Sequence, residues 1–295
     1  MRVTEEVLQE INGKLSDSGV EHKARPLEAI RLLSKDYGIS VSITSESSNF
    51  IFKWFKENSK PGSQLTGHYY EGAYFYDSEF WSVGIPIIFG STQINSIDAL
   101  HQMPENIKEQ LKADRKQAWD YVYFFADCID FGMGYSELIN NSSLDEFGLN
   151  FLKAGYEEIT SATSLLLENR PNTRAIMNCR MATEMFFKSF ISFKVGLSQK
   201  MAKDLGHNLT KLMDKFIECS GYNHLNQIKP ALSVFPEIKG RYEQQKASRQ
   251  KLFEAYSFAQ SIGTLIIREF TNINTLKQVM PSNKPINTPS GGLGQ

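Results

Sequence analysis

The chain has 295 residues, of which 41% are hydrophobic and 12% aromatic, so it can bury a sizeable core, and more than one domain is expected. Its 32 basic and 33 acidic side chains give a net charge of −1, which excludes a general positive coat for nucleic acid and leaves only a local patch for such binding. Three widely spaced cysteines without a CxxC pair indicate no disulfide framework and suit a reducing cytosol.

The first residues, MRVTEEVLQEI, are acidic and amphipathic rather than apolar, which predicts no signal peptide. No run of about 18 apolar residues occurs in the sequence, so we expect no membrane span. These features together predict a cytoplasmic protein with no membrane partner.

The chain opens with helical periodicity. Apolar residues recur at three- and four-residue steps over about residues 3–15, which predicts an amphipathic helix. A second helix is expected over about residues 26–37, because Pro26 suits a first helical turn and Gly38 suits an end. Apolar and polar residues then alternate over residues 39–44, which predicts a half-buried strand.

Aromatic and β-branched residues dominate residues 65–89, and Asp77-Ser78 offers a turn. We expect two or three antiparallel strands here, with Pro86 at an edge or a bulge. Helix is predicted again from about residue 96 to residue 138, with a break near Pro104.

The aromatic block from Tyr69 to Trp81 could stack on nucleobases or hold a small ligand. Between Pro61 and Ile107, however, the sequence has five acidic residues and neither lysine nor arginine. An acidic face repels phosphate, so the block is better interpreted as core or as a contact surface for a protein partner.

The polar, turn-rich segment of residues 139–148 is the best candidate for a domain boundary. We therefore predict an α+β fold overall: a small mixed domain of unknown type at residues 1–140, then an all-α, up-and-down helical bundle at residues 147–272. Four helices are expected in the bundle, over about residues 146–168, 171–193, 208–219 and 236–270. The low-complexity residues 279–295 are predicted to be a disordered tail.

The sequence has no GxxxxGK[ST] loop, no GxGxxG after a strand, no HExxH and no GxSxG. The common phosphate-cradling, zinc and serine-nucleophile sites therefore lack support, and we expect no cofactor. Asp127, Cys128 and Asp130 lie close together in sequence, but adjacent residues on a helix point about 100° apart. No histidine or glutamate lies one turn away, so we expect no metal site.

Arg180, Glu184 and Lys188 follow one another at four-residue spacing in the second helix of the bundle. One interpretation is a solvated salt-bridge row that adds little stability. The other is a polar groove that faces His207 or Arg241.

Arg241, Gln245 and Arg249 are expected to form a stripe near the start of the last helix. Two stacked guanidinium groups match phosphate geometry, so Arg241 and Arg249 are candidate phosphate-binding residues. The alternative is an ordinary solvated face.

His207 precedes the third helix of the bundle, in the stretch KDLGHNLTKLM. Asn208 is a favoured helix cap, so the imidazole is not needed for capping. His207 is therefore either a structural residue that bonds across to another helix or a ligand-binding or catalytic residue.

Residues 147–270 resemble the HEPN superfamily of helical domains in the order and spacing of four motifs. The first helix contains KAGYEEITSATSLL, and CRMATEMFFKSFI is similar to the family's alanine–glutamate–lysine helix. GHNLTKL looks like its glycine–histidine–aspartate–leucine turn, with Asn208 in the aspartate's place, and Arg241-Tyr242 is similar to its arginine-led segment. The resemblance implies a helical bundle that forms a homodimer and a link to RNA or nucleotides.

Many members of the superfamily are metal-independent ribonucleases of toxin or phage-defence systems, with an active-site arginine followed by a histidine four to six residues later. Here YEQQKASRQ follows Arg241, without a histidine. The resemblance therefore favours a non-catalytic RNA- or nucleotide-associated module, whose candidate ligand-binding residues are Arg241, Arg249, Glu184 and Lys188. Two alternatives stay open: a ribonuclease that uses His207 and Arg241 in a non-standard active site, and a structural protein whose aromatic N-terminal half binds a partner.

Overall fold

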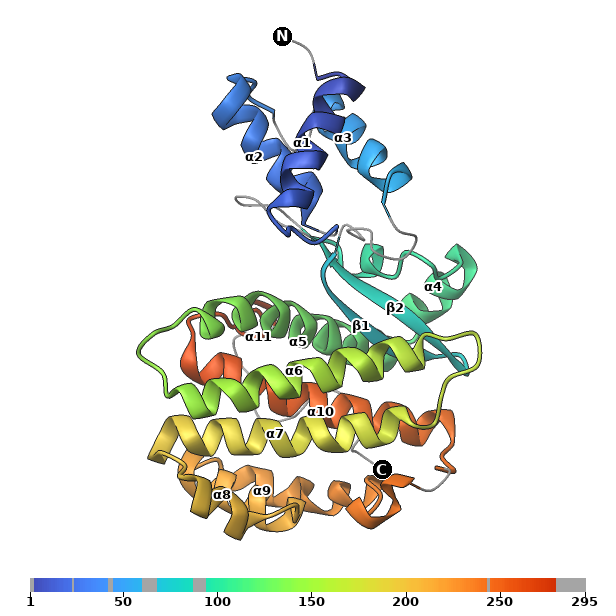
Figure 1. Cartoon of the computed structure of the whole chain (residues 1–295). Coiled ribbons are helices and arrows are strands. Elements are labelled where there is room, and N and C mark those ends of the chain that lie inside the picture. The colour runs from blue at the N-terminus through green and yellow to red at the C-terminus, as the bar shows by residue number, and fades with distance from the viewer. Residues whose placement is uncertain are drawn as a thin grey trace. The chain divides into compact units, whose positions relative to one another are not determined.

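The computed structural model describes residues 3–22, 24–41, 45–59, 68–86, 94–242 and 245–279, and Figure 1 shows their arrangement. The chain divides into two compact units, Met1–His68 and Tyr69–Gln295. The described residues are mostly helical and include one two-stranded sheet, which agrees with the predicted α+β class. Every helix within the described ranges is too short or too polar to cross a membrane.

The described residues of the first unit form three helices, α1 (Glu5–Asp17), α2 (Arg25–Tyr37) and α3 (Glu46–Glu57). The first two confirm the predicted helices. The sequence analysis missed α3, although Ser45 marks its start by accepting a hydrogen bond from the Ser48 amide at 3.2 Å. The helices bury a small apolar core of Leu8, Ile11, Leu15, Ala29, Leu33, Ile51, Trp54 and Phe55.

The strand predicted for residues 39–44 is not present in residues 39–41, and residues 42–44 lie outside the described residues. The end of α2 explains the difference. Gly38 adopts the left-handed conformation (φ 65°), and the Ile39 amide donates to the Leu33 carbonyl at 2.9 Å. The Ile39 amide thus closes a helix instead of joining a sheet.

The second unit begins with a hairpin of β1 (His68–Tyr76) and β2 (Glu79–Pro86). Asp77 and Ser78 have φ angles of 50° and 65°, as a two-residue type I′ turn requires, so the predicted turn is confirmed. Two antiparallel strands are present in the described residues, and Pro86 ends the second strand. Most of the hairpin's buried side chains point into the main core.

After the hairpin come a 3₁₀ segment, η1 (Ser96–Ala99), and the helices α4 (Glu105–Ala113) and α5 (Arg115–Ile139). The break expected near Pro104 is present, and a second one follows at Asp114. The Asp114 side chain accepts hydrogen bonds from the amides of Lys116 and Gln117 at 3.0 and 3.1 Å, so it starts α5 as an N-cap.

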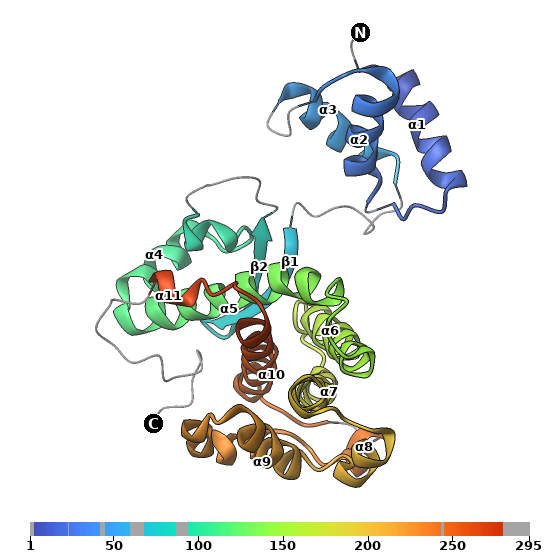
Figure 2. The ribbon, with the colours of Figure 1, turned by 90° about the vertical axis from the view of Figure 1, so that its left-hand side faces the viewer.

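The remaining elements form the bundle, with α7 at its centre. Figure 2 looks nearly along α7 and shows α6, α9 and α10 beside it, and α10 also packs on α5. Their bounds, with those of the shorter elements, are α6 (Glu146–Leu166), α7 (Ala175–Val195), α8 (Gln199–Leu205), α9 (Leu209–Ser220), η2 (Asn223–Val234), η3 (Ile238–Tyr242), α10 (Arg249–Phe270) and α11 (Leu276–Val279). The predicted helices at residues 146–168, 171–193 and 208–219 are thereby confirmed.

The last long helix was expected to begin at Pro236, and this prediction is wrong. It begins at Arg249, where the Ser248 hydroxyl accepts a hydrogen bond from the Lys251 amide at 3.2 Å. The residues described before it contain the short η3 and, at 236–237 and 245–248, no helix. Arg241 and Arg249 therefore do not lie on one helical face.

The compact units also differ from the predicted domains, residues 1–140 and 147–272. The chain divides at His68, and the segment after α5 is a loop inside the second unit. The reason is that α5 is apolar around much of its surface: Phe124 and Phe131 pack on hairpin tyrosines as well as on the bundle. The predicted tail, residues 279–295, lies outside the described residues except for Val279, which ends α11.

Candidate functional site

The row of charged residues on α7 is buried. The side chains of Arg180, Glu184 and Lys188 are 5%, 0% and 7% exposed, so the interpretation as a solvated salt-bridge row is wrong. Arg180 Nη1 lies 3.4 Å from Glu184 Oε2, and Lys188 Nζ lies 2.8 Å from Glu184 Oε1. Burial lowers the pKa of the Arg180 guanidinium, and the charge of Glu184 opposes this shift. Two cations thus flank one carboxylate.

His207 reaches this carboxylate from the turn between α8 and α9. Its Nδ1 atom lies 2.8 Å from Glu184 Oε1, while its side chain is 56% exposed. The turn is built locally by Gly206, which has a φ of 58°, and by Asn208, whose side chain accepts from the Lys211 amide at 3.1 Å. Because Asn208 provides the cap, the imidazole is free to bind Glu184.

Arg180 fixes the position of this turn. Its Nη2 donates to the His207 carbonyl at 2.7 Å, and its Nε donates to the Pro236 carbonyl at 3.0 Å. One buried guanidinium therefore ties the His207 turn and the chain before η3 to α7. These charge-assisted bonds hold the backbone around His207 in one place.

The contact with Glu184 determines the tautomer of His207. A carboxylate accepts hydrogen bonds, and Glu184 already accepts them from Arg180 Nη1 and Lys188 Nζ. The Nδ1 atom of His207 must therefore carry the proton that it shares with Oε1. In the neutral imidazole this leaves the Nε2 lone pair available to a ligand.

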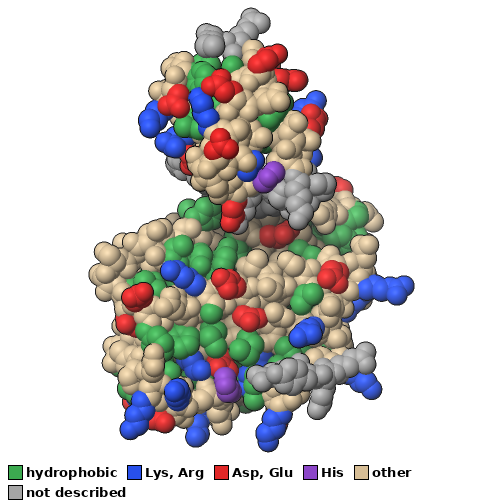
Figure 3. All heavy atoms as spheres, in the orientation of Figure 1, with side chains coloured by type: hydrophobic (Ala, Val, Ile, Leu, Met, Phe, Trp, Pro, Cys, Tyr) green, Lys and Arg blue, Asp and Glu red, His purple; other side chains and the backbone are tan. Residues whose placement is uncertain are grey.

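A surface pocket of about 400 Å³ opens beside His207. Its wall includes Lys188 of α7 and Lys203 of α8, and Phe147 at the start of α6 supplies an aromatic surface. Glu184 is fully buried behind Lys188 and His207, so it presents no exposed charge to the pocket. Figure 3 shows further positively charged side chains along the edge of the unit formed by α8 and α9, two helices whose basic residues are all lysines. The pocket therefore favours an anion.

Arg249 lies elsewhere. Its guanidinium contacts the Ser78 carbonyl and the Glu79 carboxylate on the hairpin, and it does not line the His207 pocket. The backbone of Arg241 is in η3, but its side chain lies outside the described residues. The structure thus brings together three of the five candidate residues, Glu184, Lys188 and His207, and separates Arg249 from them.

The sequence analysis missed Lys203, because α8 has only seven residues and too few apolar positions to show a period. The sequence nevertheless has one signal for a new helix here, a glycine that can end α7 followed by a serine that can cap α8. Gly196 ends α7 with a φ of 69°, and the Ser198 hydroxyl accepts from the Met201 amide at 3.2 Å, as at a helix start.

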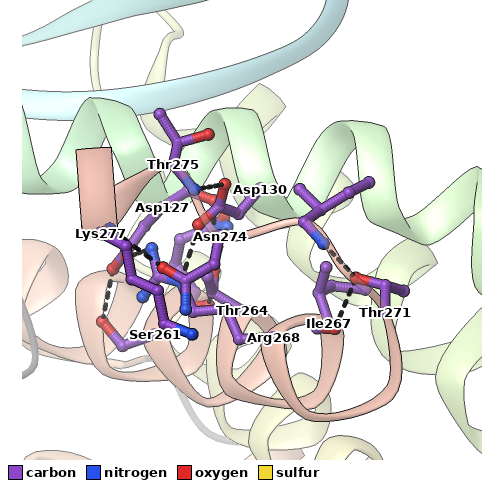
Figure 4. Close-up of polar contacts among 12 residues, drawn as sticks. Asp127, Asp130, Ser261, Thr264, Ile267, Arg268, Thr271, Asn274, Thr275 and Lys277 are labelled. Atoms are coloured by element: carbon purple, nitrogen blue, oxygen red, sulfur yellow. Dashed lines mark hydrogen bonds and ion pairs between the residues drawn. The ribbon is translucent and has the colours of Figure 1, made fainter. Parts of the chain in front are cut away.

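A second buried charge cluster joins α5 to α10, and Figure 4 shows its side chains directed at one another. Arg268 Nη2 lies 2.7 Å from Asp127 Oδ1, and Arg268 Nε lies 2.7 Å from Asp130 Oδ2. The Thr275 amide donates to Asp130 at 2.7 Å, so the cluster also holds the chain after α10. Burial and the neighbouring Asp127 raise the pKa of the Cys128 thiol, which keeps it protonated and unreactive. The cluster is a structural lock.

Metal binding finds no support in the part of the chain that the structure describes, where no group of three His, Cys, Asp or Glu side chains is placed to hold an ion. Fold and site define an α+β protein whose helical bundle carries a carboxylate-bound, exposed histidine beside a basic pocket. Comparisons with family models, curated proteins and solved structures find no match to this chain. The HEPN resemblance therefore stays a prediction.

Proposed function

We propose that the bundle is a HEPN-like module that binds the phosphate groups of RNA or of a nucleotide in the pocket beside His207. It acts without catalysis, as a homodimer in a prokaryotic-type toxin or phage-defence setting. The observation that carries the proposal is the placement of Lys188, Lys203 and His207 around one pocket whose described lining includes no acidic residue, while the carboxylate that contacts Lys188 and His207 is buried.

The charges and the size of the pocket both support this function. Arg180 and Lys188 outnumber Glu184 by one charge at the base, and Lys203 adds another at the rim. A volume of about 400 Å³ suits a nucleotide-sized ligand. Phe147 offers a ring on which a base or a sugar can pack.

The proposal predicts that Lys203→Ala weakens the binding of single-stranded RNA by about tenfold, because a charge-assisted contact to phosphate is lost. The plot of log affinity against log salt concentration should also become flatter, by about 0.7 for one lost phosphate contact. Fluorescence anisotropy with a labelled RNA measures both. Lys200→Ala is the matched control, since Lys200 is exposed on the same helix but does not line the pocket. Equal effects of the two variants would count against the pocket.

A metal-independent ribonuclease is the second candidate, and one observation favours it. Glu184 fixes His207 with its Nε2 atom free, the arrangement of a general base. This function predicts that the protein cleaves RNA in EDTA and that His207→Ala reduces the rate by about 10²–10⁴-fold. A gel assay of the wild type beside this variant decides: uncut RNA in both lanes eliminates the ribonuclease and leaves the binding module.

The alternative that the aromatic hairpin is a contact surface for a protein partner has less support than phosphate binding in the bundle. Tyr70 and Tyr74 are buried, and they pack on Phe131 and Phe124. Tyr69 is exposed at 41%, which is ordinary for a single surface tyrosine. The aromatic block is therefore chiefly core.

A further inference from the structure

We infer that the ligand of the His207 pocket is a ribonucleoside 5′-phosphate, in which the phosphate is a terminal monoester; this assignment rests on the proposed function. The ligand is either a free nucleotide or the 5′ end of an RNA. A phosphate inside a nucleic-acid chain is a diester and fits the pocket less well, for reasons of charge and depth.

The charge of the site matches a dianion. Lys188 and Lys203 line the pocket and carry two positive charges, and behind them the Glu184 carboxylate is paired with the Arg180 guanidinium, so these two buried charges cancel. A phosphomonoester has a second pKa of about 6 and therefore carries nearly two negative charges at neutral pH, whereas a diester carries one. Asp204, the neighbour of Lys203, does not line the pocket.

The burial of the Lys188 side chain also favours a phosphomonoester over a diester. Its side chain is only 7% exposed, and it is part of the wall of the pocket. Of its three N–H donors, one points to Glu184 at 2.8 Å, so others are left for ligand oxygens. A terminal phosphate can enter end-on with three free oxygens, while a diester must bring a nucleotide on either side.

His207 adds a preference for ribose. Its Nδ1–H is bound to Glu184, so the neutral ring offers Nε2 as an acceptor at the exposed side of the pocket. A ribonucleotide carries a 2′-hydroxyl that can donate to such an acceptor, whereas a 2′-deoxynucleotide does not. Lys188 and Lys203 would hold the phosphate, His207 the 2′-hydroxyl, and Phe147 the base or the sugar.

The test uses the full chain and one short RNA in three forms, labelled at the 3′ end: with a 5′-phosphate, with a 5′-hydroxyl, and with a 5′-phosphate on a 2′-deoxy first nucleotide. We expect the 5′-phosphate to raise affinity at least about tenfold over the 5′-hydroxyl form. Lys203→Ala should remove most of this gain, and Lys200→Ala should keep it. The 2′-deoxy form should bind more weakly than the ribose form to the wild type, but equally to His207→Ala.

Competition by free AMP, inorganic phosphate and 3′,5′-cyclic AMP identifies the recognised group, and the comparison of the affinities of AMP and of the 5′-phosphate RNA separates the two sources of the ligand. Displacement of the RNA by AMP, but not by the cyclic diester, identifies the monoester as the recognised group. If inorganic phosphate displaces the RNA as well as AMP does at the same concentration, the ribonucleoside is not recognised and that part of the inference is overturned. Equal affinity for the 5′-phosphate and 5′-hydroxyl RNAs would overturn the inference and leave the proposed function standing. Absence of binding both of RNA in every form and of free AMP would remove both.

Discussion

Replacing Glu184 by alanine is expected to lower the free energy of unfolding of the second unit by about 3–5 kcal/mol. The Glu184 carboxylate is 0% exposed and neutralises Arg180 and Lys188, whose side chains are 5% and 7% exposed. Without it, Lys188 keeps a buried charge with no counter-ion, and Arg180 keeps only its two carbonyl partners. Chemical denaturation of the wild type and the variant at pH 7 measures the difference.

Glu218→Ala is the matched control for this change. Glu218 is an exposed glutamate of α9 whose ion pair with Lys215 spans 2.7 Å in solvent. Removal of such a surface pair typically changes stability by less than about 1 kcal/mol. If Glu184→Ala behaves like Glu218→Ala, the buried network does not stabilise the bundle as described.

Arg268→Ala is expected to be as destabilising as Glu184→Ala, by about 3–5 kcal/mol. The change leaves Asp127 and Asp130, with side chains 3% and 0% exposed, as two buried like charges on one face of α5. Thermal and urea unfolding of the second unit should both show the loss. The effect arises in the core, so we expect it to be independent of any ligand of the His207 pocket.

Arg249→Ala serves as the control for Arg268→Ala, because both arginines are on α10 and both form ion pairs. The side chain of Arg249 is 38% exposed and that of its partner Glu79 is 53% exposed, so its loss should change stability by less than about 1 kcal/mol. A similar loss in the two variants would mean that burial does not distinguish these ion pairs.

Local patterns in the sequence predicted much of the helical bundle. The apolar stripe of Leu209, Leu212, Met213 and Phe216 marks α9, and all four residues are buried as the spacing requires. The Asp77-Ser78 turn was also predicted, since both residues tolerate a positive φ better than most. These features depend on neighbours in sequence and can be recognised without tertiary contacts.

Features that depend on distant contacts were not predictable in this way. The last long helix was predicted to begin at Pro236 instead of Arg249, because no local pattern marks the residues before Arg249 as non-helical. The hydrogen bond that Arg180 donates to the Pro236 carbonyl joins residues far apart in sequence. The division of the compact units at His68 was not predictable either, because the packing of the hairpin on α5 is a tertiary contact. Only the structure supplies these contacts.

The site was predicted in part. Four-residue spacing aligned Arg180, Glu184 and Lys188, and the hypothesis of a groove that faces His207 agrees with the contact between Glu184 and His207. Burial of the row could not be predicted, because charged residues at this spacing are usually solvated. Arg249 was predicted to bind phosphate together with Arg241 because both were placed on one face of the last helix, but α10 begins only at Arg249.

The most direct test of the central claim, that the pocket beside His207 binds phosphate groups, is an NMR titration of the protein labelled with ¹⁵N-histidine. A short single-stranded RNA is added, and the imidazole signals of His207 and His224 are followed. His224 is exposed and does not line the pocket, so it is an internal control. We predict a saturable shift of the His207 signals with those of His224 unchanged, and in Lys203→Ala the same shift at about tenfold higher RNA concentration. RNA binding that leaves the His207 signals unmoved would contradict the account.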